Sequence, residues 1–307
     1  MSQTTLARIT ERVENMSLNH LDQYINVKDI SFKNLDTVRI GDESHILKPI
    51  AQQSIANRLG IPIQYLRRCP EDIQALNMNH WIKEEKNEEL LFRFAGDDVR
   101  AVFTKRYVPT DNIEVLQKIQ AIGYDPETRV HCNLDDDFMS LNIPDGKQTF
   151  QFNGEKMTPG ISISNSEVGL ASLSIAAFML RLVCTNGMIS KTEVSASYRH
   201  VSVKILTELP GVLNNVSQEL GKQKNQLKLS MESKVDNPES TINSFNRQFL
   251  LNKEEKEAVG WALPLEWGFT MFNIVNIYTK AAQHDDLSAE SRYRLQKVGG
   301  MILEMVR

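Results

Sequence analysis

The stretch GLASLSIAAFMLR, residues 169–181, decides how the middle of this chain folds. Its alanine, leucine and methionine residues favour a helix, but apolar and polar residues roughly alternate from Leu170 to Ile175, which is the period of a strand. We interpret residues 170–184 as a strand. The run is too short to cross a bilayer before Arg181 interrupts it, and no secretory segment opens the chain, so we expect a soluble cytoplasmic protein.

Arg181 poses the first functional question. An unpaired guanidinium is expensive to bury, so Arg181 must reach a carboxylate, a row of carbonyl groups, a phosphate or water. The sequence leaves these alternatives open. Asn186-Gly187, shortly after it, is a turn signal that ends the strand, because both residues tolerate a positive φ.

Upstream, LLFRFAGDDVRAVFTKRY, residues 90–107, has a period of two and a turn signal in GDD, which predicts a β-hairpin. With Asp97 and Asp98 as the loop, we expect Phe94 opposite Ala101 and Phe92 opposite Phe103. The other face then carries Arg93, Arg100, Thr104 and Arg106. Such a face is either a solvated outer surface of the sheet or a guanidinium platform for phosphates.

The remaining patterns predict an α+β fold with an antiparallel sheet core in the middle third. Residues 128–134 and 137–143 suggest a second hairpin, residues 161–166 and 198–203 further strands, and Asp111 with Glu114 a capping box that starts a helix. Prolines and glycines divide residues 48–82 into short helices, and the pattern is helical from about residue 207. We expect a helical N-terminal region (1–85), a β-rich core (86–206) and a helical C-terminal region (207–307).

Charge and motifs exclude several function classes. The chain has 35 Lys and Arg against 39 Asp and Glu, a net charge of −4, so any anion site must be local. Its three cysteines are far apart and lack zinc-site spacing, and we expect neither metal nor cofactor. The run Asp135 to Asp137 is interpreted as a solvated turn rather than a cation site. HExxH, GxSxG and GxxxxGK[ST] motifs are absent, which leaves His200 and His131 as weak catalytic candidates.

Several blocks together resemble the phage- and plasmid-borne family catalogued as domain of unknown function 932. They are AQQSIANRLGIPIQYLRR with NMNHWI, VRAVFTKRYVPTDNIEVL, ISNSEVGLASLSIAAFMLRLVCTNGM, YRHV, and GFTMFNIVNIYTKAAQ with RLQKVGGMIL. Coverage runs from about residue 48 to 305, and Ile277 stands where alanine is usual. The resemblance implies an accessory protein of mobile elements and a role in replication, recombination or defence evasion. It assigns no catalytic residue.

The leading hypothesis is a single-stranded DNA-binding or annealing protein that forms homo-oligomers. An alternative is a metal-independent phosphodiesterase that uses His200 or His131 with arginines, and another is an interaction protein that targets a host factor. The lysine-rich stretch 222–234 is either a solvated helix face or a nucleic-acid contact. The expected nucleic-acid contacts are Arg93, Arg100, Lys105, Arg106, Tyr107, Arg181, Arg199 and His200.

Overall fold

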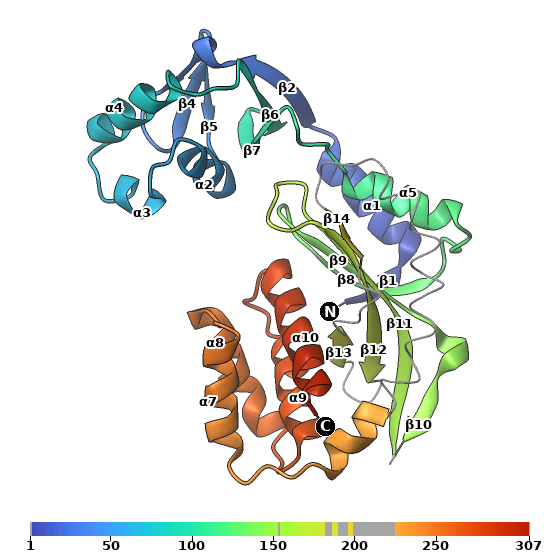
Figure 1. Ribbon diagram of the computed structural model, residues 1–307. Coiled ribbons are helices and arrows are strands. Elements are labelled where there is room, and N and C mark those ends of the chain that lie inside the picture. The colour runs from blue at the N-terminus through green and yellow to red at the C-terminus, as the bar shows by residue number, and fades with distance from the viewer. Residues whose placement is uncertain (1, 153, 182–185, 190–195, 199–224, 307) are drawn as a thin grey trace.

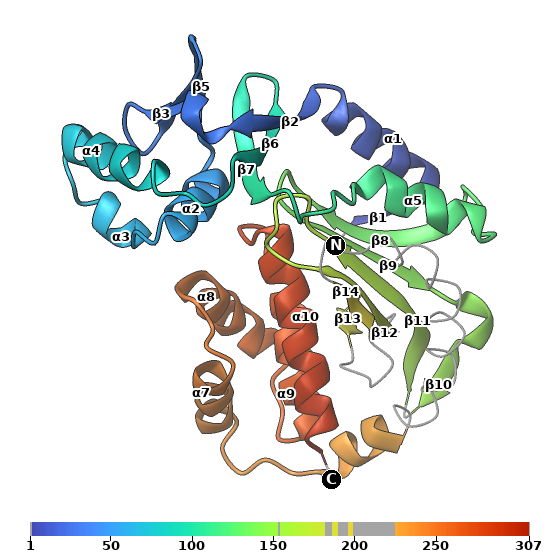
Figure 2. The same ribbon diagram turned by 45° about the horizontal axis from the view of Figure 1, so that its top comes forward.

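The computed structural model describes residues 2–152, 154–181, 186–189, 196–198 and 225–306. Figure 1 shows three parts: an N-terminal unit, a central sheet and a group of C-terminal helices. The N-terminal unit and the C-terminal helices both lie to the left of the central sheet in Figures 1 and 2, and the sheet connects them. The mixed helix and antiparallel-sheet architecture confirms the predicted α+β class.

The N-terminal unit contains strands as well as helices, which corrects the expectation of a helical region over 1–85. One sheet has the order β2 (His20–Asn26), β6 (Glu89–Ala95), β7 (Asp98–Thr104). A second consists of β3 (Ile30–Phe32), β4 (Thr37–Ile40) and β5 (Glu43–Ile46), after the 3-10 turn η1 (Val27–Asp29). Strands of three or four residues are too short to show a period of two. The helices are α2 (Pro49–Arg58), α3 (Ile63–Leu66) and α4 (Glu71–Ile82).

The predicted hairpin over 90–107 is confirmed as β6 and β7, but its register differs. Arg93 lies opposite Ala101 and Phe94 opposite Val99, so Arg100 is the extra residue of a β-bulge. The turn falls at Gly96-Asp97, where Gly96 has a φ of 60°, one residue earlier than expected. The predicted pairs of Phe94 with Ala101 and Phe92 with Phe103 are therefore wrong, because a bulge leaves no trace in the alternation of residue types.

The central sheet confirms the strand predicted over 170–184 for its residues Leu173–Arg181, which form β12. Its order is β1-β8-β9-β11-β12-β13, β10 and β14 pair with β11 and β12, and every pairing is antiparallel. The strands are β1 (Ser2–Thr5), β8 (Arg129–Leu134), β9 (Met139–Pro144), β10 (Phe150–Phe152), β11 (Glu155–Asn165), β12 (Leu173–Arg181), β13 (Asn186–Ile189) and β14 (Ala196–Tyr198). The 3-10 turn η2 (Gly146–Gln148) precedes β10.

One face of this sheet is apolar and is covered by α1 (Leu6–Ser17) and α5 (Asn112–Ala121). Leu6, Ile9 and Val13 of α1 are buried there, as their helical spacing predicts. The Asp111 and Glu114 capping box starts α5, also as predicted. The opposite face of the sheet is turned toward the C-terminal helix α10 (Ala289–Glu304), which packs against β8, β9 and β13 (Figure 2).

The C-terminal part is helical where it is described, as expected. Residues 225–232 are helical and are followed by α7 (Pro238–Gln248), α8 (Lys253–Ala262), the turn η3 (Leu263–Leu265), α9 (Met271–Ala281) and α10. Asn237 and Ser288 cap α7 and α10 through their side chains. Within the described ranges, no helix is both long and apolar enough to cross a membrane.

Candidate nucleic-acid interface

Arg93 is buried rather than presented to solvent, which corrects its expected place on a cationic face. Its side chain is 1% exposed and lies where the N-terminal unit meets the central sheet. Nε donates to Asp22 at 2.9 Å, Nη2 to Asp111, and Nη1 to the carbonyl oxygen of Glu167 at 2.9 Å. Burial alone would lower the pKa of Arg93, but the Asp111 and Asp22 carboxylates outweigh it and raise that pKa. Arg93 is thus occupied by structural ion pairs.

Arg100 is likewise buried, at 4% exposure, and pairs with Glu167 at 2.6 Å. The β-bulge directs this side chain toward the loop between β11 and β12. Glu167 also accepts the backbone N–H of Asn112 at 2.7 Å, and the His20 ring lies 3.7 Å from its carboxylate. Burial, and secondarily the charge of Arg100, lowers the pKa of His20. Glu167 therefore ties the hairpin to the start of α5.

The question about Arg181 is answered by two carboxylates. Its Nε and Nη2 bond Glu155 at 2.8 and 2.6 Å, and Nη1 bonds Glu266 at 2.9 Å. The guanidinium also lies over the Phe272 ring, 5.5 Å from the centroid. These bonds lower the pKa of Glu155. Arg181 joins the sheet to the segment before α9 and is the last residue of β12, a strand that lies apart from β6 and β7 in Figure 1. The expected single cationic surface therefore does not form from these arginines.

The remaining predicted residues fall into four cases. Lys105 pairs with Glu89 at 2.7 Å on the surface. Tyr107 is half-buried, its hydroxyl donates to the Glu167 carbonyl at 3.3 Å, and burial raises its pKa to about 12. Arg106 is exposed and forms no ion pair with any described residue. Arg199 and His200 lie outside the described residues.

A groove of about 550 Å³ surrounds Arg106 and Tyr107. We call it the Arg106 groove. The Phe103 and Tyr107 rings stack inside it with centroids 3.7 Å apart. Helix α2 forms one wall, strand β7 another, and the loop between β11 and β12 the third. The polar and charged side chains of the groove, besides Arg106 and Tyr107, are Gln53, Ser54, Asn57, Arg58 and Thr104.

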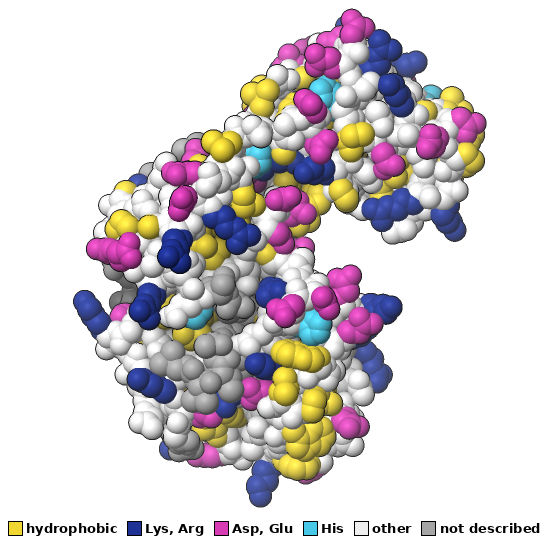
Figure 3. Space-filling model, turned by 180° about the vertical axis from the view of Figure 1, so that it is seen from behind, with side chains coloured by type: hydrophobic (Ala, Val, Ile, Leu, Met, Phe, Trp, Pro, Cys, Tyr) yellow, Lys and Arg dark blue, Asp and Glu magenta, His cyan; other side chains and the backbone are white. Residues whose placement is uncertain are grey.

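More cations lie near the groove on the N-terminal unit. Arg58 has a half-buried guanidinium that pairs with Glu85 at 3.2 Å. Arg67 and Arg68 follow α3, which packs on α2, and both are exposed. Figure 3 shows a hollow between the N-terminal unit and the C-terminal helices, with Lys and Arg side chains gathered along the N-terminal rim. Sequence analysis missed Arg58, Arg67 and Arg68, although YLRR without an adjacent acid was a signal for exposed cations.

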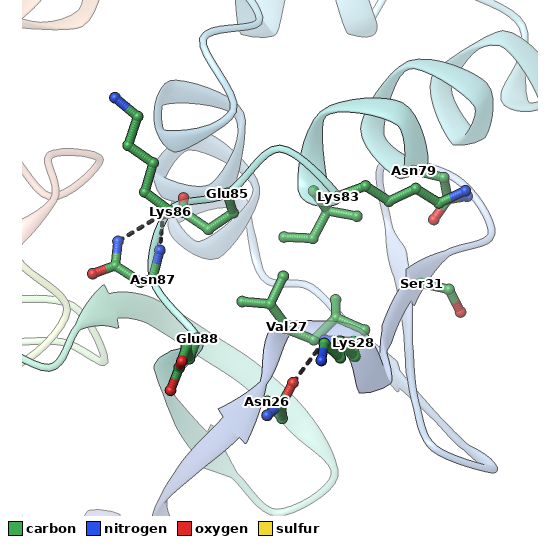
Figure 4. A pocket seen from close by; sticks show the side chains of 12 residues that line it. Asn26, Val27, Lys28, Ser31, Asn79, Lys83, Glu85, Lys86, Asn87 and Glu88 are labelled. Atoms are coloured by element: carbon green, nitrogen blue, oxygen red, sulfur yellow. Dashed lines mark hydrogen bonds between the residues drawn. The ribbon is translucent and has the colours of Figure 1, made fainter.

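A second pocket, of about 780 Å³, lies within the N-terminal unit between η1 and the segment that follows α4 (Figure 4). Lys83 and Lys86 extend from its rim in different directions. Glu85, also at the rim, accepts two hydrogen bonds from Asn87, at 2.9 and 2.6 Å. Because Lys83 and Lys86 do not converge, we assign this pocket no ligand.

His131, a candidate acid-base residue, is 3% exposed on β8, and Cys132 points to the opposite face of the sheet as predicted. Burial lowers the pKa of His131 below its ordinary value of 6.5. The unfolded chain therefore takes up a proton near pH 6.5 that the folded chain does not. We expect the free energy of unfolding to fall by up to about 1.4 kcal/mol per pH unit below 6.5.

Urea unfolding at pH 7.5 and 5.5 checks this expectation. His131→Gln should reduce the loss of stability between the two pH values, whereas His80→Gln, in exposed surroundings on α4, should leave it unchanged. An identical pH dependence in the wild type and in His131→Gln would contradict the assignment.

Comparison with known proteins gives one match. A family model described as "Domain of unknown function (DUF932)" matches residues 99–295. No curated protein and no solved structure matches the chain. The matched range contains β7, Arg106, Tyr107 and the loop that closes the groove, whereas α2 and α3 precede it.

Proposed function

We propose that this chain, which belongs to the DUF932 family, binds single-stranded nucleic acid in the Arg106 groove. The observation that carries the proposal is the position of an exposed guanidinium, Arg106, beside the stacked rings of Phe103 and Tyr107. Cations that track a backbone, combined with aromatic rings, are the usual elements of a single-strand site. In this proposal Arg106 binds phosphate, and the buried arginines Arg93, Arg100 and Arg181, which pair with carboxylates, do not.

The charge distribution supports a strand that follows the N-terminal rim of the hollow. Arg67 and Arg68 lie at the end of α3, Arg58 on the adjacent α2, and Arg106 after β7. Arg58 retains donor capacity because Glu85 engages only its Nη1. A chain with a net charge of −4 needs such a local concentration of cations to attract a polyanion.

The groove itself has the size and chemistry for the base of a nucleotide. Gln53 and Asn57 project from α2, where Gln53 Nε2 donates to Asn57 Oδ1 at 2.8 Å, and the other two amide atoms, Gln53 Oε1 and Asn57 Nδ2, can contact the edge of a base. A base that stacks on this ring pair would gain about 1–3 kcal/mol. Duplex DNA keeps its bases stacked on each other, so we propose a preference for single strands.

Salt-dependent binding tests this function. The variant Arg67→Gln/Arg68→Gln/Arg106→Gln should lower the slope of log affinity against log salt by about 2, because each lost phosphate contact on a single strand removes about 0.7. The measurement is fluorescence anisotropy of a labelled single-stranded 20-mer, with a duplex and an RNA of the same sequence in parallel, at two or more salt concentrations.

Arg39→Gln provides the matched control, because Arg39 is exposed on β4, pairs with Asp42 and does not line the groove. This control should keep the wild-type slope. A triple variant that melts like the wild type and binds with an unchanged slope would refute the proposal, as would the absence of binding at low salt.

The wider role that we propose rests on the family resemblance. We propose that the protein acts in the cytoplasm of a bacterial host as a homo-oligomeric accessory factor in the DNA metabolism of a phage or plasmid. Resemblance to proteins carried by mobile elements supports this role, because replication and recombination of such elements expose single strands.

A further inference from the structure

The sheet face turned toward α10 carries an unusual block of polar side chains. These side chains form two rows that run across β8, β9 and β11, in that strand order. The first row is His131, Asn142 and Ser162, and the second is Asn133, Ser140 and Ser164. Each of the six side chains is at most 5% exposed. The neighbouring β12 residue, Ala176, packs with Tyr293 of α10, so this polar face lies under that helix. We call the six residues the polar block.

The polar block has hydrogen-bonding capacity that the described residues do not use. Both amide atoms of Asn142 lack a partner, and so do Asn133 Nδ2, His131 Nδ1 and the hydroxyls of Ser140, Ser162 and Ser164. Buried polar groups in native proteins nearly always have a partner, whether protein, water or ligand. A buried face with this many donors and acceptors without a partner is suited to hold a polar molecule.

A pocket of about 460 Å³ opens at the corner of the polar block where Asn133 lies. Among the described residues, β1 pairs with β8 from Arg129 to Cys132, and Asn133 and Leu134, the next residues of β8, line the pocket. Asn133 is 5% exposed, and its Nδ2 lacks a partner.

Two guanidinium groups stand at this pocket. Arg12 of α1 donates Nη2 to the carbonyl oxygen of Leu134 at 3.1 Å, and Arg292 of α10 donates Nη2 and Nε to the carbonyl oxygens of Asp285 and Leu287 at 2.9 and 3.0 Å. These partners are backbone carbonyl groups, and neither guanidinium forms an ion pair with a described residue. Two acids, Asp135 and Asp285, also line the pocket, and the Asp135 carboxylate accepts three backbone N–H groups, among them that of Ala289.

We propose that this pocket and the adjoining polar block bind a small phosphorylated ligand with a polyhydroxylated body, such as a sugar phosphate or a nucleoside monophosphate. Arg12 and Arg292 hold the phosphate, and Asn133 directs the neutral body toward the polar block. Hydroxyl groups, which donate and accept, match the serine and asparagine side chains of the polar block, of which Asn133 lines the pocket. The pocket volume lies within the range of small-molecule sites. This site is separate from the Arg106 groove and does not depend on nucleic-acid binding.

Isothermal titration calorimetry of the full chain with ribose 5-phosphate and UMP tests the proposal. At least one should bind about tenfold more tightly than inorganic phosphate, because its body adds hydrogen bonds that phosphate lacks. Arg292→Gln and Asn133→Ala should each weaken binding about tenfold. Arg8→Gln, an exposed residue of α1 that does not line the pocket, is the matched control and should bind as the wild type does.

Ser162→Ala separates a ligand site from a merely structural one. It removes an unpartnered hydroxyl, so the ligand-free protein should melt at the same or a higher temperature, while ribose 5-phosphate or UMP binds more weakly. The proposal is overturned if neither probe binds at millimolar concentration, or if Asn133→Ala and Arg292→Gln bind them as tightly as Arg8→Gln does. None of these outcomes changes the salt slope expected at the Arg106 groove.

Discussion

Replacing Arg93 with methionine is expected to lower the free energy of unfolding by about 3 kcal/mol, the low end of the cost for a buried ion pair, because Arg93 is 1% exposed while Asp22 and Asp111 are 30% and 38% exposed. Arg93 bonds Asp22 of β2, Asp111 at the start of α5 and the Glu167 carbonyl. The substitution keeps most of the side-chain volume but leaves two carboxylates without their cation. Denaturation in urea, followed by circular dichroism, measures the loss.

Two further variants test whether the loss of stability in Arg93→Met comes from its ion pairs. Arg39→Met removes an exposed pair with Asp42 and should cost less than about 1 kcal/mol. In Arg93→Met/Asp22→Asn, part of the loss should return because one of the stranded charges is removed. If Arg93→Met is no less stable than Arg39→Met, the ion pairs do not hold the N-terminal unit against the sheet.

The second large effect concerns Arg181. Arg181→Met is expected to lower the free energy of unfolding by about 3 kcal/mol, because Glu155 and Glu266 both lose a bond to a guanidinium that is 11% exposed. The affinity for single-stranded DNA, measured at a temperature where the variant is folded, should remain that of the wild type. A melting curve measures the change in stability, and an anisotropy titration measures the affinity for single-stranded DNA.

Lys280→Met serves as the control for Arg181→Met. Lys280 is a partly buried cation on α9 that bonds a glutamine, Gln283, rather than a carboxylate. Lys280→Met therefore leaves no buried carboxylate without a partner, and it should lower the free energy of unfolding less than Arg181→Met does. The opposite result for Arg181→Met, lost affinity with an unchanged melting curve, would make Arg181 a ligand-binding residue and contradict its structural role.

Both arginines show why the candidate site could be predicted only in part. Alternation along residues 90–107 correctly predicted a hairpin with an apolar face, yet it could not place the bulge that directs Arg100 to Glu167. It also could not show that Asp22, 71 positions earlier in the chain, would lie against Arg93. Of the predicted contacts, Arg106 is the one exposed cation without an ion pair among described residues, and Arg58, Arg67 and Arg68 were not predicted.

The polar block shows a second feature that the sequence could not predict, the burial of polar side chains. Serine and asparagine alternate with apolar residues in β8, β9 and β11, which by itself indicates strands with one solvated face. The structure places α10 over that face, and the six polar side chains become buried. Nothing in the local sequence distinguishes a polar residue that faces water from one that faces a helix.

Local signals in the sequence determined the elements: the capping box at Asp111, the prolines that start short helices, the alternation in β6, β8, β11 and β12, and the α+β class that follows from them. The family was also recognisable from the chain. Tertiary structure alone decided which charges are neutralised, because Arg93, Arg100 and Arg181 meet acids that are distant in sequence. Helix caps and strand periods act within a few residues, whereas an ion pair or a covered polar face depends on how separate elements pack.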